Sequence, residues 1–209
     1  MKKRICVIGG CGHVGIPLGL AFASKGFHVT LIDCNETAVQ HINSGTLPFK
    51  KERADELLRA HIGVNLFATT DVAQTALHDV VVFVTGTPVD EHLNPRVNDV
   101  LKVITSYLQH LSSRQLVILR STIFPGVTQI VDNLLTQALG ATKLAFCPER
   151  IVQGKGIEEI FNLPQIVSAT SEQALSEASE LFSAIAKKII PLSTTEAALD
   201  KLMTNAWRY

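Results

Sequence analysis

Six residues near the start of the chain have the spacing of a dinucleotide-binding loop. Residues 10–15 form a G-x-G-x-x-G run that follows an apolar segment at 5–8 and opens a helical pattern. In such loops the first glycine permits a tight turn, the second lets the backbone approach a pyrophosphate, and the third lets helix and strand pack closely. The amino end of the helix adds N–H groups and a positive dipole end. The residues predicted to surround the cofactor here are Gly10, Gly12, His13, Val14 and Gly15.

An acidic residue stands at the position expected for the ribose contact. Asp33 ends the next apolar segment, residues 28–32, eighteen residues after Gly15. A carboxylate there can accept hydrogen bonds from both hydroxyls of the adenine ribose and would repel a 2′-phosphate. Glycines alone also form ordinary turns, so the prediction depends on the strand, helix, second strand and acid occurring together. The sequence therefore favours NAD over NADP.

Runs rich in β-branched residues alternate with helical patterns along the chain. A continuous apolar run such as V-V-V-F-V at 80–84 is typical of a strand covered on both faces. We expect an α/β fold of the Rossmann type, with a doubly wound, mostly parallel sheet and helices on both faces. Strands are predicted at 5–8, 28–32, 80–84, 116–119, 144–146, 165–168 and 188–192, and helices near 14–24, 36–42, 53–61, 100–110, 126–139 and 172–185.

The last seventeen residues have a different pattern. Residues 193–196, S-T-T-E, fit a capping box, which predicts a helix from there to the end. At about 100° per residue this helix has two faces, one with Lys201, Asn205 and Arg208 and the opposite one with Leu199, Leu202, Met203 and Ala206. We expect residues 1–192 to form the NAD-binding domain and residues 193–209 to start a helix that leads to a separate substrate domain.

The composition excludes several classes of protein. Lys and Arg total 19, and so do Asp and Glu, so a formal charge of zero gives no electrostatic case for nucleic acid or a membrane surface. A basic start before an apolar run imitates a secretory signal, but five glycines and Pro17 interrupt it. The four cysteines lack C-x-x-C pairing and the histidines lack ligand spacing. We therefore expect a cytoplasmic protein with reduced thiols and no metal.

Beyond the glycine run, which continues as G-I-P at 15–17, four ordered motifs resemble the UDP-glucose/GDP-mannose dehydrogenase family. They are G-T-P at 86–88, S-T-I-F-P-G at 121–126, C-P-E-R at 147–150 and E-A-A-L-D-K-L-M-T-N at 196–205. The resemblance covers the whole chain but only the N-terminal part of the family's pattern. It implies oxidation of the C6 hydroxymethyl of a nucleotide sugar to a carboxylate by two NAD⁺ in succession, through a cysteine thiohemiacetal and thioester.

The resemblance also implies roles for single residues. Thr87 would lie beside the cofactor, and Thr122 would lie near the nicotinamide, where its hydroxyl can orient a water. Glu149 would be the acid/base carboxylate, while Lys201 and Asn205 would stabilise developing charge on the sugar oxygen. The residues expected to contact the substrate are Arg150, Ile151, Lys201, Asn205 and Arg208.

Each of these residues also has an ordinary structural explanation. Thr122 could begin a turn before Pro125, Glu149 could pair with Arg150 on a surface loop, and Lys201 could be a solvated helix lysine. Because all the motifs occur in family order, we favour the functional interpretation.

The chain also departs from the family pattern. His13 replaces a usual tyrosine, Ala38 stands where a basic residue is frequent, and Arg120 stands where some relatives have lysine. The family's nucleophilic cysteine belongs to a glycine-rich segment well beyond Tyr209, and none of the chain's four cysteines has an equivalent position. The 209 residues alone are therefore expected to be inactive.

Three functions remain open at this point. The first is the NAD-binding part of a nucleotide-sugar 6-dehydrogenase for polysaccharide biosynthesis, with a UDP-hexose substrate and a full-length homodimer, both implied by the family. The P-E-R form at 148–150 resembles the branch that acts on UDP-N-acetylhexosamines. The second is a stand-alone NAD-binding or sensing module. The third, a 3-hydroxyacid dehydrogenase relative, is disfavoured by the motifs at 121–122 and 148–150.

Overall fold

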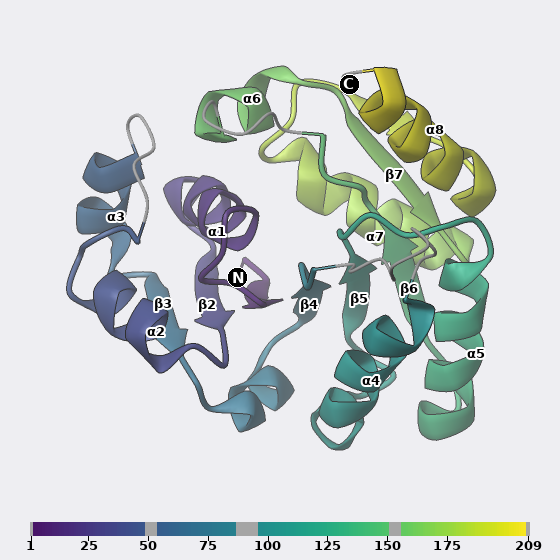
Figure 1. Cartoon of the computed structure of the whole chain (residues 1–209), viewed down its shortest axis with the longest axis horizontal. Helices are drawn as coiled ribbons and strands as arrows, with labels where there is room; N and C mark the ends of the chain where they lie inside the picture. Colours follow the sequence, from purple (N-terminus) through teal and green to yellow (C-terminus); the bar gives the residue numbers. More distant parts are fainter. Residues whose placement is uncertain (1, 49–53, 87–95, 151–155, 208–209) are drawn as a thin grey trace.

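One sheet organises the molecule, with its strands in the order β3-β2-β1-β4-β5-β6-β7-β8 (Figure 1). All neighbours pair in parallel except β6 and β7, which are antiparallel. The computed structural model describes residues 2–48, 54–86, 96–150 and 156–207. The strands are β1 (Arg4–Ile8), β2 (His28–Ile32), β3 (Leu66–Thr69), β4 (Val80–Phe83), β5 (Leu116–Leu119), β6 (Lys143–Phe146), β7 (Gln165–Ala169) and β8 (Ile189–Pro191).

Helices cover both faces of this sheet. One face is buried under α1 (Gly15–Ser24), α2 (Glu36–Asn43), α3 (Ala54–His61), α6 (Gly156–Asn162) and α7 (Glu172–Ser183). The other face is buried under α4 (Val97–Tyr107), α5 (Val127–Leu139) and α8 (Thr194–Trp207). Two short 3-10 helices, η1 (Val72–Leu77) and η2 (Leu108–His110), lie beside one another. In the part of the chain that is described, no helix is long and apolar enough to cross a membrane.

Strand β4 shows why the sequence favours this three-layer arrangement. Its four residues are all buried, and successive side chains of a strand point to opposite faces. Val80 and Val82 join the core under α1 and α7, while Val81 and Phe83 join the core under α4 and α5. A strand with two buried faces must be apolar throughout, so the predicted Rossmann-type fold is confirmed.

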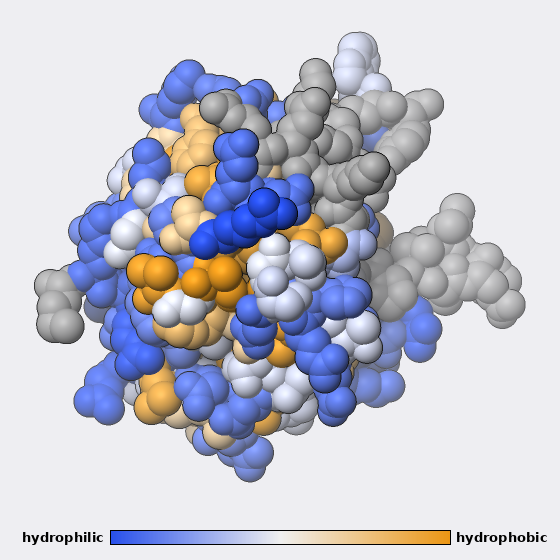
Figure 2. All heavy atoms as spheres, turned by 90° about the vertical axis from the view of Figure 1, so that its left-hand side faces the viewer, coloured by the Kyte–Doolittle hydropathy of each residue, from blue (hydrophilic) through white to orange (hydrophobic). Residues whose placement is uncertain are grey.

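Two features of the sheet differ from the prediction. Strand β3 was not predicted, because it is a four-residue edge strand whose residues alternate between buried and half-buried without a β-branched run. Together with α2 and α3, this edge strand forms one end of the molecule, whose surface is largely hydrophilic with an apolar strip across it (Figure 2). The antiparallel direction of β7 also has no signal in the residue pattern, because period and burial are the same for both directions.

The predicted capping box at the start of α8 is confirmed. The main-chain N–H of Ser193 donates to the Glu196 carboxylate at 2.8 Å, and the N–H of Glu196 donates to the Ser193 hydroxyl at 3.2 Å. These reciprocal bonds satisfy two donors that a helix start otherwise leaves open. They fix the residue at which α8 begins.

A buried histidine, His78, makes the stability of the fold depend on pH. His78 lies between η1 and the sheet, where Nδ1 donates to the carbonyl of Gln74 at 2.8 Å and Nε2 accepts from the Thr30 hydroxyl at 2.9 Å. Burial lowers the pKa of His78, and the positive charge of Arg4 lowers it further. The unfolded chain therefore takes up a proton at a higher pH than the folded chain does.

We predict that the free energy of unfolding decreases as the pH falls through about 6.5, the ordinary pKa of histidine, toward the lower folded value. Urea titrations at pH 7.5 and 5.5 measure this dependence. In His78→Gln the decrease should be smaller, although part of it should persist because burial also lowers the pKa of His28. Identical pH dependence in the two proteins would show that His78 is not the group responsible.

Candidate functional site

The predicted cofactor and catalytic residues gather at one edge of the sheet. The loops after β1, β2, β4, β5 and β6 all leave the carboxyl ends of parallel strands. Strands β2 and β3 lie on one side of β1, and the later strands from β4 onward lie on the other side. The strand order therefore reverses between β1 and β4, which are neighbours at the centre of the sheet. Open parallel sheets form ligand crevices at this kind of position.

The glycine loop after β1 combines two different steric requirements. A Cβ atom at Gly10 would lie 2.6 Å from the carbonyl oxygen of Val7, and one at Gly15 would lie 2.4 Å from the carbonyl oxygen of Gly10. Both positions therefore require glycine for packing. At Gly12 the nearest atom to such a Cβ is the Gly9 carbonyl oxygen at 3.7 Å, so the protein itself leaves this position open. Open space above a backbone at the start of α1 fits a pyrophosphate.

Asp33 is tied to the same loop. One carboxylate oxygen accepts the main-chain N–H of Cys11 at 3.0 Å, and the other accepts the N–H of Asn35 at 3.0 Å. The side chain is half-buried, so it is oriented by these bonds while remaining accessible. Each carboxylate oxygen has a further acceptor site. The loop and the acid are thus arranged as a dinucleotide requires, and His13 is exposed on the same loop.

A cavity of about 260 Å³ adjoins the start of α1. It brings together four of the predicted site residues from four separate parts of the chain: Val14, Thr122, Glu149 and Lys201. The hydroxyl of Ser121 donates to the carbonyl of Thr85, which joins the loops after β5 and β4 beneath the cavity. The remaining lining residues are Val84, Thr85, Gly86, Arg120 and Ser121.

The base of this cavity contains a buried ion pair. Nε and Nη2 of Arg120 donate to one carboxylate oxygen of Glu149, at 2.9 and 2.6 Å. Nη1 donates to the carbonyl of Cys147 at 3.2 Å and to the side-chain oxygen of Gln165 at 3.0 Å. The guanidinium also lies 5.1 Å from the centre of the Phe182 ring. Arg120 is only 2% exposed, so these contacts replace its hydration and hold it in one orientation.

The other oxygen of Glu149 accepts the main-chain N–H of Arg150 at 2.8 Å. Donors therefore approach the carboxylate from both sides and hold it in one orientation. The carbonyl of Glu149 accepts a hydrogen bond from Nζ of Lys201, which reaches it from α8. This bond joins Lys201 to the loop of Glu149, and both residues line the cavity although they are 52 residues apart in the chain.

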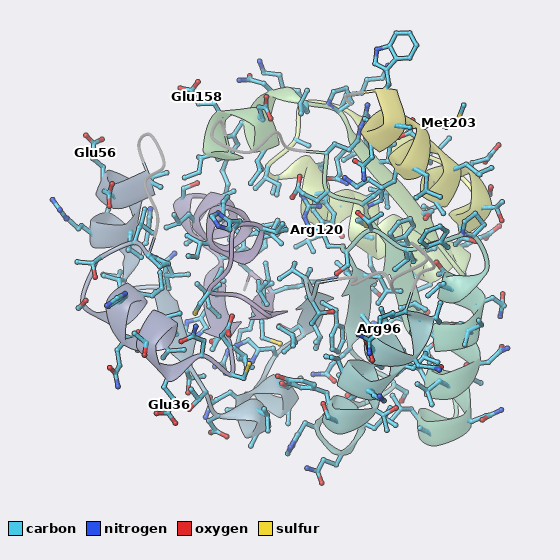
Figure 3. All side chains as sticks on the ribbon, viewed as in Figure 1. Glu36, Glu56, Arg96, Arg120, Glu158 and Met203 are labelled. Atoms are coloured by element: carbon cyan, nitrogen blue, oxygen red, sulfur yellow. The ribbon has the colours of Figure 1, made fainter. Side chains whose placement is uncertain are left out.

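The orientation of α8 is the reverse of an ordinary surface helix. Lys201 is 8% exposed and lies on the inward face with Ala197 and Ala198, whereas Met203 is 71% exposed. Figure 3 shows Arg120 near the centre of the molecule and Met203 projecting from the outer side of α8. The two faces predicted from the sequence exist, with the lysine face turned inward and Leu199 and Met203 turned outward.

The remaining predicted residues are less closely assembled. Arg150 lies 3.9 Å from the carboxylate of Asp200 on α8, and Asn205 is half-exposed near the end of the same helix. Neither belongs to the lining of the cavity. Thr87, Ile151 and Arg208 lie outside the described residues.

Neither the central role of Arg120 nor the contact made by Gln165 is predicted by the sequence. In the sequence Arg120 stands out only as a departure from lysine, because a residue's neighbours across a sheet cannot be read from local spacing. A weak signal did exist: an arginine directly follows the apolar strand L-V-I-L at 116–119. A charged group at the end of a buried strand needs a partner, and Glu149 follows the neighbouring strand β6.

The three buried cysteines do not supply a reactive thiol. Burial raises the pKa of Cys147 to about 12, and burial together with the nearby Asp33 charge raises that of Cys11 to about 12. Burial also raises the pKa of Cys6, and Cys34 is exposed directly after Asp33. A nucleophilic cysteine needs a lowered pKa, so the three buried thiols are structural.

A family model and several known proteins match the sequence of the chain. A model of the UDP-glucose/GDP-mannose dehydrogenase family, NAD binding domain, matches residues 3–186. The UDP-N-acetyl-D-mannosamine dehydrogenase of Pyrococcus horikoshii is 28% identical over 212 residues, which cover 98% of this chain and 50% of that protein. The chain spans about half the length of the curated relatives that it matches.

Solved structures show the same relationship. The structure of UDP-D-ManNAc dehydrogenase from Pyrococcus horikoshii matches with a TM-score of 0.92 and 28% identity, covering 98% of this chain and 50% of that one. The NDP-N-acetyl-D-galactosaminuronic acid dehydrogenase of Methanosarcina mazei Go1 matches with a TM-score of 0.89 and 27% identity, covering 99% and 47%.

The buried ion pair between Arg120 and Glu149 predicts that substitutions of these two residues have large and non-additive effects on the free energy of unfolding. Arg120→Met should leave the Glu149 carboxylate buried without its main donors, and should lower the free energy of unfolding by about 3–5 kcal/mol. The double variant Arg120→Met/Glu149→Gln removes both charges and should be more stable than the single variant. Urea titrations of the four proteins of this cycle measure the coupling. Simple additivity would contradict a direct interaction between the two side chains.

Proposed function

Because the chain belongs to the UDP-glucose/GDP-mannose dehydrogenase family, whose NAD-binding domain matches residues 3–186, we propose that it forms the NAD-binding part of a nucleotide-sugar 6-dehydrogenase. The observation that supports this most strongly is the joint placement of Glu149 and Lys201 beside the glycine loop. A plain cofactor-binding module needs the loop and Asp33 but has no use for a buried lysine and carboxylate next to it.

In this proposal the loop and α1 hold the cofactor. The backbone at Gly12 and the amino end of α1, at His13 and Val14, face the pyrophosphate, while Asp33 accepts hydrogen bonds from the adenine ribose. Thr87 and Thr122 are proposed to contact the nicotinamide end of the cofactor. When bound, NAD⁺ supplies a hydride acceptor, and all other chemistry falls to side chains.

The side chains of the cavity divide the remaining work. Glu149 takes or returns a proton at the C6 oxygen, either directly or through a water that the Thr122 hydroxyl orients. Lys201, with Asn205, stabilises negative charge that develops on the same oxygen. Arg120 keeps the Glu149 carboxylate in place, supported by its contacts to Gln165 and to the carbonyl of Cys147. Arg150, Ile151 and Arg208 are proposed to contact the sugar nucleotide.

The covalent step needs a thiol that these residues do not supply. Burial raises the pKa values of the three buried cysteines and keeps them as thiols. Cys34 directly follows Asp33, at the ribose end of the proposed cofactor site. We therefore propose that the nucleophilic cysteine and most of the sugar-nucleotide pocket belong to a longer protein. Residues 1–192 would form its NAD-binding domain, and residues 193–209 the start of the helix that leads to the substrate domain.

The proposed substrate is a UDP-N-acetylhexosamine. Two observations support this choice: the P-E-R form of the loop after β6, and the names of several relatives, which are UDP-N-acetyl-D-mannosamine dehydrogenases. We further propose that the longer protein is a homodimer, in which the outward apolar side chains of α8, Leu199 and Met203, become covered.

We predict that the chain binds NAD⁺ more tightly than NADP⁺. Calorimetric titration of both cofactors measures the difference, and Asp33→Ala should weaken NAD⁺ binding by about 1–3 kcal/mol through loss of a half-buried, oriented acceptor. A suitable control is Asp71→Ala, which removes a carboxylate that also accepts a main-chain N–H, from Ala73 at the start of η1. Equal binding of both cofactors, or equal effects of the two variants, would refute the role of Asp33.

A further prediction concerns catalysis. The 209-residue chain should form no NADH from UDP-glucose, UDP-N-acetylglucosamine or UDP-N-acetylmannosamine, because both the thiol and most of the proposed sugar-nucleotide pocket are missing. In the longer protein with its cysteine, Lys201→Met should lower kcat by about 10²-fold or more, since developing charge loses its partner.

The control for that experiment is Lys102→Met, which alters an exposed lysine on α4. NADH absorbance at saturating substrate gives kcat, and calorimetry checks that NAD⁺ binding survives in both variants. Methionine keeps the volume of the buried side chain, so the fold should be retained. Full activity of Lys201→Met would mean that the lysine only supports the loop at Glu149. Inactivity of the unaltered longer protein on every nucleotide sugar would instead favour a binding or sensing module.

A further inference from the structure

The edge of the sheet opposite the cofactor loops carries a cluster of positive charge. Arg4 begins β1, Lys143 begins β6, and Arg114 lies two residues before β5. The strand register places Ile5 and Lys143 in one row across β1, β4, β5 and β6, so the three basic residues share the amino edge. Four neighbouring strands at a spacing of about 4.8 Å span roughly 14 Å.

These residues surround a cavity of about 480 Å³. Its lining also includes Lys2 and Lys3 from the segment before β1, and two carboxylates, Asp79 and Glu177. Five cationic side chains against two carboxylates leave a formal excess of three positive charges. The whole chain has a formal charge of zero, so this excess is concentrated locally and is not a property of the surface in general.

The two carboxylates do not neutralise the arginines. Glu177 on α7 accepts hydrogen bonds from both Lys3 and Lys143 at 2.9 Å. Although burial alone would raise it, these ammonium groups hold the pKa of Glu177 below its ordinary value, so one negative charge orients two positive ones. Asp79 is occupied by the main-chain N–H of Arg4, at 2.7 Å. In the described part of the chain, no ion pair joins the guanidinium of Arg4 or Arg114 to a carboxylate.

We propose that this cavity binds a compact multivalent phosphate anion, a polyphosphate or the phosphate chain of a nucleotide, independently of the cofactor site. Guanidinium groups match phosphate oxygens with paired donors, and the ammonium groups of Lys3 and Lys143 are already held in place at the cavity wall. A neighbouring cavity is lined by Lys2, Phe27 and the acidic residue Glu180. Because this additional negative charge lies near Lys2, the excess of positive charge is greatest near Arg4 and Arg114. The anion should therefore lie between these two arginines.

The shape of the charged region favours a small anion over nucleic acid. Polyelectrolytes are bound by extended basic stripes that follow a backbone over many phosphates. Here the cations converge on one cavity, and the chain as a whole is neutral. A chain of two or three phosphates can contact several of them at once, whereas a duplex cannot enter a cavity of this size.

The test is calorimetric titration of the 209-residue chain with sodium tripolyphosphate in the presence of saturating NAD⁺, which occupies the glycine loop. The unaltered chain should show saturable binding at one site. Arg4→Gln/Arg114→Gln should weaken that binding about tenfold or more, because two charge-assisted contacts are lost. Arg59→Gln/Lys102→Gln removes the same charge from exposed positions on α3 and α4 and should leave the affinity unchanged.

Parallel titrations with ADP and ATP distinguish the two sources of phosphate. Affinity equal to that of a free polyphosphate of the same length would identify the phosphate chain as the whole ligand, and tighter binding would identify a nucleotide. The proposal is overturned if tripolyphosphate gives no saturable binding, if NAD⁺ displaces it, or if both double variants weaken it equally. Binding of an oligonucleotide without binding of tripolyphosphate would also overturn it.

Discussion

The buried guanidinium of Arg120 connects more of the site than any other single group that the structure describes. It leaves the end of β5 and contacts the loop after β6, the first residue of β7 and a ring on α7. Desolvating an arginine is costly unless every donor is used, so these contacts are mutually dependent. Glu149 is the central partner, because its side chain balances the charge while its carbonyl receives Lys201 from α8.

This dependence explains why α8 turns its lysine inward. A lysine that pointed to solvent would leave the Glu149 carbonyl without this donor in a region where nearby groups are buried. The capping box at Ser193 and Glu196 sets the start of the helix, and Ala197 and Ala198 pack against the core one turn before Lys201. Small residues there let the helix approach closely enough for the ammonium group to reach the loop after β6.

The sequence predicts those parts of the molecule that depend on local chemistry. The glycine spacing, the acid after β2 and the capping box are local patterns, and the structure realises each of them. The buried strands are equally readable, since two-sided burial requires continuous apolar runs. Strand β3, the direction of β7 and the partners of Arg120 are not readable, because they depend on which segments meet across the sheet. Which face of α8 turns inward also depends on the segments that α8 contacts.

The residues on the two sides of the candidate site differ in how firmly contacts within the chain hold them in place. On the cofactor side, Asp33 is bonded to the loop, and steric contacts fix the backbone at Gly10 and Gly15. At the centre, Glu149 is held between donors on both of its oxygens. On the far side, Asn205 is half-exposed and Met203 faces solvent. Preorganised groups act on charge without reorganisation, so the contacts within the chain already set the glycine loop, Asp33 and Glu149 in place. In the proposed function, the residues of α8 that contact the sugar would be held less firmly than these groups.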